Sequence, residues 1–158
     1  MTRITRKDVL LISYLRKDAR GSLTSISRYT NIPISTLFDR LKVINNSFIK
    51  KNTCLLNFGK LGYDIRVTLL LKAHENSKDE LRKYLEFNQN VNNMYRVSNG
   101  YDFLVEAVFK SLKEMDFFIE KLRSFNLSDS KEYFILEEVK RESFLADPSL
   151  LPDITILQ

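Results

Sequence analysis

The segment between residues 22 and 45 places the strongest constraint on what this chain can fold into. Two stretches of helical periodicity flank a short linker, TNIP, at residues 30–33. Asparagine accepts the left-handed conformation of a tight turn, and proline suits the first turn of a new helix but cannot continue an earlier one. The segment therefore predicts two helices joined by a tight turn, the arrangement of a helix-turn-helix unit.

The second helix of this unit, expected from about Ile34 to Asn45, is amphipathic. Leu37, Leu41 and Ile44 recur at the spacing of one helix face and predict its buried side. The opposite face is polar and partly basic, a character that suits the major groove of DNA. Two short helices and a turn also occur in proteins that bind no DNA. The distribution of charge is therefore needed to distinguish a DNA-binding protein from one that does not bind DNA.

The charge of the chain is distributed unevenly. The net charge is +5, but residues 1–60 carry 12 Lys/Arg and 3 Asp/Glu, a net +9, whereas residues 61–158 carry 13 Lys/Arg and 17 Asp/Glu, a net −4. A basic part that contains a helix-turn-helix is typical of a protein that binds a polyanion. We therefore expect the N-terminal part to bind double-stranded DNA, from which the acidic part would be repelled.

Several polar or basic side chains of the N-terminal part are candidates for contact with DNA. They are Arg28, Ser35, Thr36, Arg40, Lys42, Lys50 and Lys51. Arg40 is expected to donate to a guanine edge or a phosphate, and Lys42 and Arg28 to phosphates. The two hydroxyl groups are expected at phosphates or base edges near the start of the helix, and the last two lysines flank the groove. For each of them the alternative is an ordinary solvated surface side chain.

A further helix is expected before the helix-turn-helix unit. Thr5 and Asp8 have the spacing of a capping box, in which a hydroxyl and an acid three residues later satisfy backbone amides at a helix start. Residues 1–50 then form a three-helix DNA-binding domain. Residues 51–63 are expected to form a hinge, with a short strand at residues 53–57 followed by a glycine-containing turn.

Residues 64–142 alternate in the order β-α-β-β-α-β, a ferredoxin-like arrangement. The expected strands cover residues 65–73, 91–97, 103–109 and 131–140. Ser77 and Ser111 are expected to open capping boxes for the two helices. The predicted fold class is thus α+β, with an N-terminal three-helix helix-turn-helix head joined by a strand and hinge to a C-terminal βαββαβ dimerisation and effector domain.

The two helices of such a domain cover one face of the sheet, and the other face must also be buried. A second copy of the chain is the natural candidate, because self-pairing supplies the twofold symmetry that many DNA operators have. The tail, residues 143–158, is apolar for a terminus. It is expected either to fray or, through Ile154–Leu157, to add a strand or dock on a neighbouring subunit.

Composition argues against several other classes of protein. A run of about 18 apolar residues and an apolar stretch behind the N-terminus are both missing, so neither a membrane span nor a signal peptide is expected. The single cysteine, Cys54, fits a reducing cytoplasm. One histidine and one cysteine cannot form a metal site without distant acids, and a phosphate-binding glycine-rich loop is lacking. We therefore expect no metal and no cofactor.

Four stretches of the chain resemble the leucine-responsive regulatory protein/asparagine operon regulator (Lrp/AsnC) family. They are DARGS at residues 18–22, ISR at 26–28 with Ile32, LLN at 55–57 with LGY at 61–63, and VSNGYDF at 97–103 with EVK at 138–140. Their order and spacing, rather than any single motif, carry the resemblance, which covers roughly residues 3–142.

The resemblance implies a sequence-specific transcription regulator, cytoplasmic and associated with the nucleoid, that dimerises through its C-terminal sheets and often assembles into tetramers or octamers. It also implies an amino acid or similar small-molecule effector near residues 98–102. The candidate effector-binding residues are Asn99, Gly100, Tyr101 and Asp102. The first two replace the family's usual Gly-x pair, which leaves open an unusual effector or none. Asp102 could instead cap the turn while Tyr101 packs.

The amino-acid sequence also leaves two alternative functions open. An architectural protein that coats DNA would make the same contacts with little sequence preference. An enzyme similar to the siroheme decarboxylases would need histidine and arginine in a C-terminal pocket. The one histidine, His74, lies at a predicted strand end, and a basic head would have no purpose in such an enzyme, so a regulator is the expected function.

Overall fold

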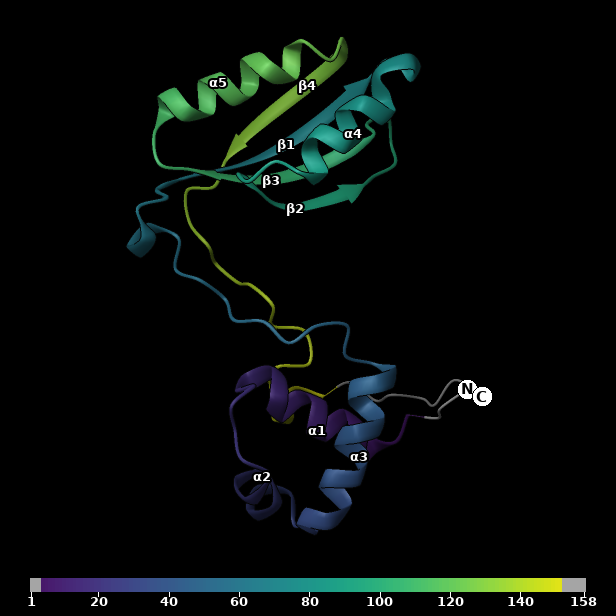
Figure 1. Ribbon diagram of the computed structural model, residues 1–158. Helices are drawn as coiled ribbons and strands as arrows, with labels where there is room; N and C mark the ends of the chain where they lie inside the picture. The colour runs from purple at the N-terminus through teal and green to yellow at the C-terminus, as the bar shows by residue number, and fades with distance from the viewer. Residues whose placement is uncertain (1–3, 152–158) are drawn as a thin grey trace. The chain divides into compact units, whose positions relative to one another are not determined.

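The structure, a computed structural model, describes residues 4–151, which form two compact units (Figure 1). One unit contains the residues up to Cys54 together with the segment from Val139 onward, and the other is Leu55–Glu138. In the described part of the chain, no helix is long and apolar enough to cross a membrane. The Ile154–Leu157 strand suggested by the sequence lies outside the described residues.

The N-terminal unit contains three helices, α1 (Arg6–Lys17), α2 (Leu23–Thr30) and α3 (Ile34–Ser47). Asn31, which ends α2, has a φ of 55°, so the tight turn predicted from the sequence is confirmed. The capping box at Thr5 is confirmed as well, with both of its hydrogen bonds present. The three helices enclose a small apolar core made of Leu11, Ile26, Ile32, Leu37 and Ile44.

The segment after Glu138 packs on this unit. The guanidinium of Arg16 on α1 donates to the backbone oxygen of Glu142 at 2.9 Å and to its carboxylate at 3.0 Å. A short 3₁₀ helix, η3 (Pro148–Leu150), follows, and Asp147 caps it by accepting from the amide of Ser149. The part of the tail that the structure describes is thus held against the helices.

The second unit is a ferredoxin-like domain. Its order is β1 (Ile65–Ala73), α4 (Lys78–Glu86), β2 (Val91–Arg96), β3 (Phe103–Phe109), α5 (Leu112–Arg123) and β4 (Leu127–Phe134). The strands form one antiparallel sheet in the order β2-β3-β1-β4. Two 3₁₀ turns, η1 (Gly59–Leu61) and η2 (Glu75–Ser77), precede β1 and α4. The predicted fold class and the predicted order of strands and helices are confirmed.

The core of this domain lies between one face of the sheet and the two helices, both of which cover that face (Figure 1). Alternate side chains of β1 and β3 point into it, as the pleat of a strand requires. They are Val67, Leu69, Leu71 and Ala73 on β1, and Phe103, Val105, Ala107 and Phe109 on β3. The remaining side chains of these strands form a second, uncovered face.

One strand prediction is wrong, and another has the wrong bounds. Residues 53–57 are irregular, and Leu55 and Leu56 are 56% and 51% exposed, because a strand needs a paired neighbour and the four-stranded sheet does not include this segment. The last strand is β4, which ends at Phe134, opposite Val67 near the start of β1, rather than at residue 140. The apolar residues that suggested residues 131–140 mostly follow the strand.

The capping box predicted at Ser77 is also wrong. The η2 turn places this residue at φ −108° and ψ −6°, and its side chain makes no cap hydrogen bond. Its hydroxyl donates to the backbone oxygen of His74 instead. At Ser111 the hydroxyl accepts from the amide of Glu114, as predicted, but the carboxylate of Glu114 accepts from the amide of Lys110 rather than from the cap residue.

Candidate nucleic-acid interface

Helix α3 has one face directed away from the core of the N-terminal unit. Its first turn begins at Pro33, which makes no side-chain cap hydrogen bond, so the amide groups there are not engaged by a cap. The buried stripe contains Leu37 and Ile44. The exposed stripe on the far side consists of Ser35, Phe38, Asp39, Lys42 and Asn46. This stripe is the candidate surface for the major groove.

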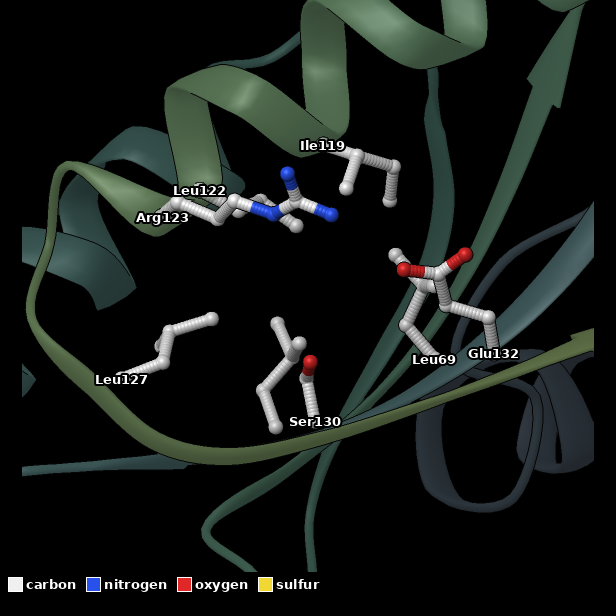
Figure 2. Close-up of a pocket in the computed structure, with 8 residues that line it drawn as sticks. Leu69, Ile119, Leu122, Arg123, Leu127, Ser130 and Glu132 are labelled. Atoms are coloured by element: carbon white, nitrogen blue, oxygen red, sulfur yellow. The ribbon is translucent and has the colours of Figure 1, made fainter.

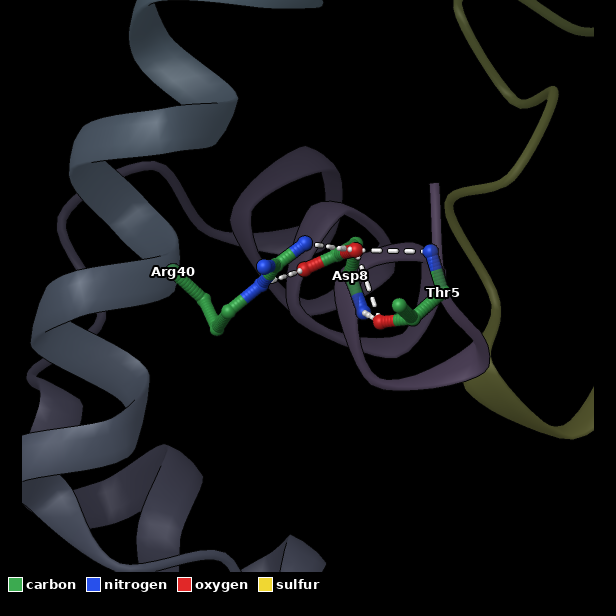
Figure 3. Close-up of polar contacts among 3 residues, drawn as sticks. All are labelled: Thr5, Asp8 and Arg40. Carbon is green, nitrogen blue, oxygen red and sulfur yellow. Dashed lines mark hydrogen bonds and ion pairs between the residues drawn. The ribbon is translucent and has the colours of Figure 1, made fainter. Parts of the chain in front are cut away.

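Arg40 does not belong to this stripe. Its guanidinium reaches α1 and forms a bidentate ion pair with Asp8, in which Nε donates to Oδ1 and Nη2 donates to Oδ2 (Figure 3). The Asp8 side chain is fully buried, whereas that of Arg40 is 29% exposed. The contact with DNA that the sequence predicted for Arg40 would therefore have to compete with an intramolecular partner.

Asp8 is the centre of this contact. Its Oδ2 also accepts from the backbone amide and the hydroxyl of Thr5, each at 2.7 Å. Burial raises the pKa of Asp8, but the hydrogen bonds from Arg40 and Thr5 outweigh burial and leave the pKa below its usual value. The hydrogen bond to Asp8 raises the pKa of Arg40 in turn. The pair fixes α3 against the start of α1.

The other predicted DNA-binding residues lie on several surfaces. Ser35 and Lys42 share the exposed stripe of α3, whereas Thr36 is half-buried at its edge. Arg28 is exposed on α2. Lys50 and Lys51 are exposed in the irregular segment that follows α3.

Phe38 was not predicted from the sequence as a site residue. Its ring is 50% exposed, and the Nζ of Lys42 lies 4.4 Å from the ring centroid. A signal was present, because Phe38 does not share the spacing of Leu37, Leu41 and Ile44 and stands one helical turn before Lys42.

The residues predicted to bind an effector lie in the turn between β2 and β3. Asn99 and Gly100 both have positive φ, at 65° and 90°. Asp102 accepts from the amide of Ala73 at 3.0 Å and pairs with the ammonium of Lys78 at 2.9 Å. The carboxylate of Asp102, a candidate for effector binding, is thus already paired with a lysine.

Tyr101 is also engaged within the domain. Its hydroxyl donates to the carboxylate of Asp129 at 2.6 Å, and the Nζ of Lys131 lies 5.5 Å from its ring centroid. The hydrogen bond to Asp129 raises the pKa of Tyr101. Polar contacts therefore connect this turn to β4 and to α4. An effector that binds at the turn would have to contact other groups or displace these polar contacts.

A small hollow lies on the helix-covered side of the sheet, between α5 and β4 (Figure 2). Arg123 and Glu132 extend toward it, and its floor includes Leu69 and Leu127. The hollow has space for about one water molecule. It is too small for an amino acid, and among the described residues no group of acids, histidines and cysteines could hold a metal ion.

A basic three-helix unit with a helix-turn-helix, followed by a ferredoxin-like domain, defines a class of two-part DNA-binding proteins. Residues 65–145, about half of the chain, match the family model for the Lrp/AsnC ligand binding domain. The chain belongs to the Lrp/AsnC family and is a DNA-binding transcription regulator rather than an enzyme.

Individual proteins agree with this assignment. An uncharacterized HTH-type transcriptional regulator of Pyrococcus abyssi is 28% identical over 142 residues, which cover 89% of this chain and 97% of that protein. The structure of LrpC from Bacillus subtilis has a TM-score of 0.80 at 18% identity, covering 88% of this chain and 99% of LrpC. A transcriptional regulator from Neisseria meningitidis in an L-Met complex has a TM-score of 0.80 at 15% identity, covering 87% and 93%. The two structures support the fold.

Proposed function

We propose that this regulator is a homodimer that binds specific DNA sequences by placing α3 of each subunit in the major groove. The observation that carries the proposal is the exposed stripe of α3, which combines a hydroxyl, an aromatic ring and a lysine on the most basic part of the chain. In this arrangement Lys42, Arg28, Lys50 and Lys51 contact phosphates, and Ser35 and Thr36 lie near the helix start. Arg40 holds α3 in position.

Lys42→Ala is expected to weaken DNA binding and to reduce the slope of log affinity against log salt by about 0.9, the contribution of one neutralised phosphate. Binding to genomic fragments should be measured by electrophoretic shift at several salt concentrations, with sequencing of the bound fraction. Lys83→Ala is a matched control, because Lys83 is an exposed lysine on α4 in the acidic part of the chain. An unchanged slope in Lys42→Ala would remove Lys42 from the interface.

The same experiment separates a regulator from an architectural protein. A regulator enriches a palindromic motif whose half-sites are about one helical turn apart, because the two recognition helices of a dimer reach the same side of the duplex. Uniform recovery of all fragments would favour an architectural protein.

The uncovered face of the sheet supports the dimer. Leu70 on β1 lies opposite Leu104 on β3, and the row continues to Tyr95 on β2. A second aromatic side chain, Tyr133 on β4, is 50% exposed in the neighbouring row, opposite Thr68. The apolar side chains of this row gain from leaving water, and a second copy of the same face would bury them with twofold symmetry.

We expect at least one amino acid to bind the dimer near residues 98–102. The matching family model describes a ligand-binding domain, and a Cβ added at Gly100 would meet no atom within 4 Å, so this loop has open space beside it. Calorimetric titration with each of the twenty amino acids should detect heat for one or a few of them. If none of the twenty amino acids produced heat, this result would contradict an amino-acid effector and leave the DNA-binding proposal unchanged.

A further inference from the structure

The exposed stripe of α3 contains more apolar surface than its role as a polyanion-binding face requires. Phe38 is 50% exposed in the middle of the stripe, and Ile34, which borders the stripe one turn earlier, is 46% exposed. Neither belongs to the apolar core of the N-terminal unit. Two large apolar side chains that lie one helical turn apart on an exposed helix face form a contiguous apolar patch, and such patches mark candidate contact surfaces.

The surroundings of Phe38 restrict the nature of that partner. The ammonium of Lys42 stands over the ring, so an incoming partner meets an apolar surface with a cation beside it. The carboxylate of Asp39 is exposed on the same stripe and can only accept hydrogen bonds when ionised. The stripe therefore offers an apolar contact, a phosphate contact and an acceptor within two helical turns.

The major groove of DNA has one apolar group, the C5-methyl of thymine. A phenylalanine ring cannot hydrogen-bond to a base edge, but it can pack on this methyl. The carboxylate of Asp39 can accept a hydrogen bond from the amino group of adenine or from that of cytosine, so it does not distinguish an A·T pair from a G·C pair. The preference for an A·T pair therefore depends on Phe38, because a G·C pair lacks the methyl group.

We infer that Phe38, with Ile34 beside it, packs on thymine methyl groups in the major groove and makes this protein prefer half-sites with A·T pairs under the middle of α3. The inference rests on the proposed function, since it assigns what the DNA-binding face reads. It concerns base readout and is separate from the phosphate contact of Lys42.

The test compares two duplexes that differ in the methyl group alone. A 40-base-pair duplex, the one that wild-type protein recovers most often from a random library, is synthesised with thymine and again with uracil at every thymine position. Wild-type protein, Phe38→Ala and the control Phe87→Ala are titrated with both. Phe87 is a matched control, because its ring is 87% exposed just after α4 in the other unit.

Wild-type protein and Phe87→Ala should lose about fourfold in affinity for each contacted methyl group that uracil removes, the effect of leaving one carbon unburied. Phe38→Ala should lose most of this difference between the two duplexes, with the same salt slope as wild type, and only the contribution of Ile34 should remain. Phe38→Leu, which keeps an apolar surface, should retain part of the preference. Circular dichroism of each variant establishes that it is folded.

Two results would overturn the inference alone: equal binding of the two duplexes by wild type, or the same thymine preference in Phe38→Ala as in wild type. Failure of wild-type protein to bind either duplex in a salt-dependent way would overturn the proposed function together with the inference. The three results are distinguishable in a single set of titrations.

Discussion

Replacing Arg40 by alanine is expected to lower the free energy of unfolding of the N-terminal unit by about 3 kcal/mol, at the low end of values for breaking a buried ion pair because the arginine is partly exposed. The substitution leaves the fully buried carboxylate of Asp8 without its cation. Urea unfolding of the full-length protein measures the loss, and hydrogen exchange of the amides of α1 and α3 assigns it to this unit.

Arg28→Ala serves as the control, because Arg28 is exposed on α2 and its removal should change stability by no more than about 0.5 kcal/mol. The double variant Asp8→Ala/Arg40→Ala should be less destabilised than the sum of the two single variants, because it leaves no buried charge. Wild-type stability in Arg40→Ala would contradict a structural role. A salt slope lowered by about 0.9 in the folded variant would instead restore Arg40 as a phosphate contact.

The dependence of stability on pH gives a second test of the Asp8–Arg40 ion pair. The pKa of Asp8 lies below the value of about 3.9 that it has in the unfolded chain. A lowered pKa stabilises the fold above the unfolded pKa, and this stabilisation is lost as the pH falls through the folded pKa. Wild-type protein should thus lose stability below about pH 4. In Arg40→Ala the pKa of Asp8 should be higher than in the wild type, because burial still raises it and the hydrogen bonds from Arg40 no longer lower it. The variant should therefore lose less stability than the wild type when the pH falls.

Leu70→Asp is expected to convert the dimer into monomers and to lower DNA affinity by about 10²-fold or more, because the two recognition helices would no longer be linked. Leu70 lies on the uncovered face of the sheet, opposite Leu104, where a dimer interface would desolvate the new carboxylate. Sedimentation analysis measures the assembly, and electrophoretic shift measures the affinity.

Gln89→Asp introduces the same charge at an exposed position outside the strands and should leave the dimer unchanged. Leu104→Asp should reproduce the effect of Leu70→Asp, since the two side chains are cross-strand neighbours. If both leucine variants stay folded and dimeric, the dimer uses a different surface. Circular dichroism distinguishes dissociation from unfolding.

Features with local causes were predictable from the sequence. The left-handed turn at Asn31, the capping box at Thr5 and the strands β1 and β3 follow from residues that are neighbours in the chain. The resemblance to the Lrp/AsnC family also came from short motifs in a fixed order, and the family model agrees with it. The starts of the two helices in the C-terminal domain were predicted from Ser77 and Ser111, and α4 and α5 begin directly after these residues.

Strand β4 could not be predicted in the same way. Its first half is polar, with Ser128, Asp129 and Ser130 before Lys131. These residues are extended because β1 offers them backbone hydrogen bonds, with Leu71 opposite Ser130 and Lys72 opposite Asp129. Residues 53–57 are the reverse case. Their apolar residues suggested a strand, but the segment has no paired neighbour and is irregular.

Turns, caps and periodicity act over a few residues, and for this reason the basic head, the helix-turn-helix and the βαββαβ order could be predicted from the sequence. The side of α3 that is free depends instead on how the helices pack together. Arg40 and Phe38 lie two positions apart on that helix, and both are plausible DNA contacts in a linear sequence. Arg40 is directed toward α1, where the buried carboxylate of Asp8 requires a cation, and Phe38 is left in solvent. That choice depends on a residue 32 positions away, beyond the reach of any local pattern.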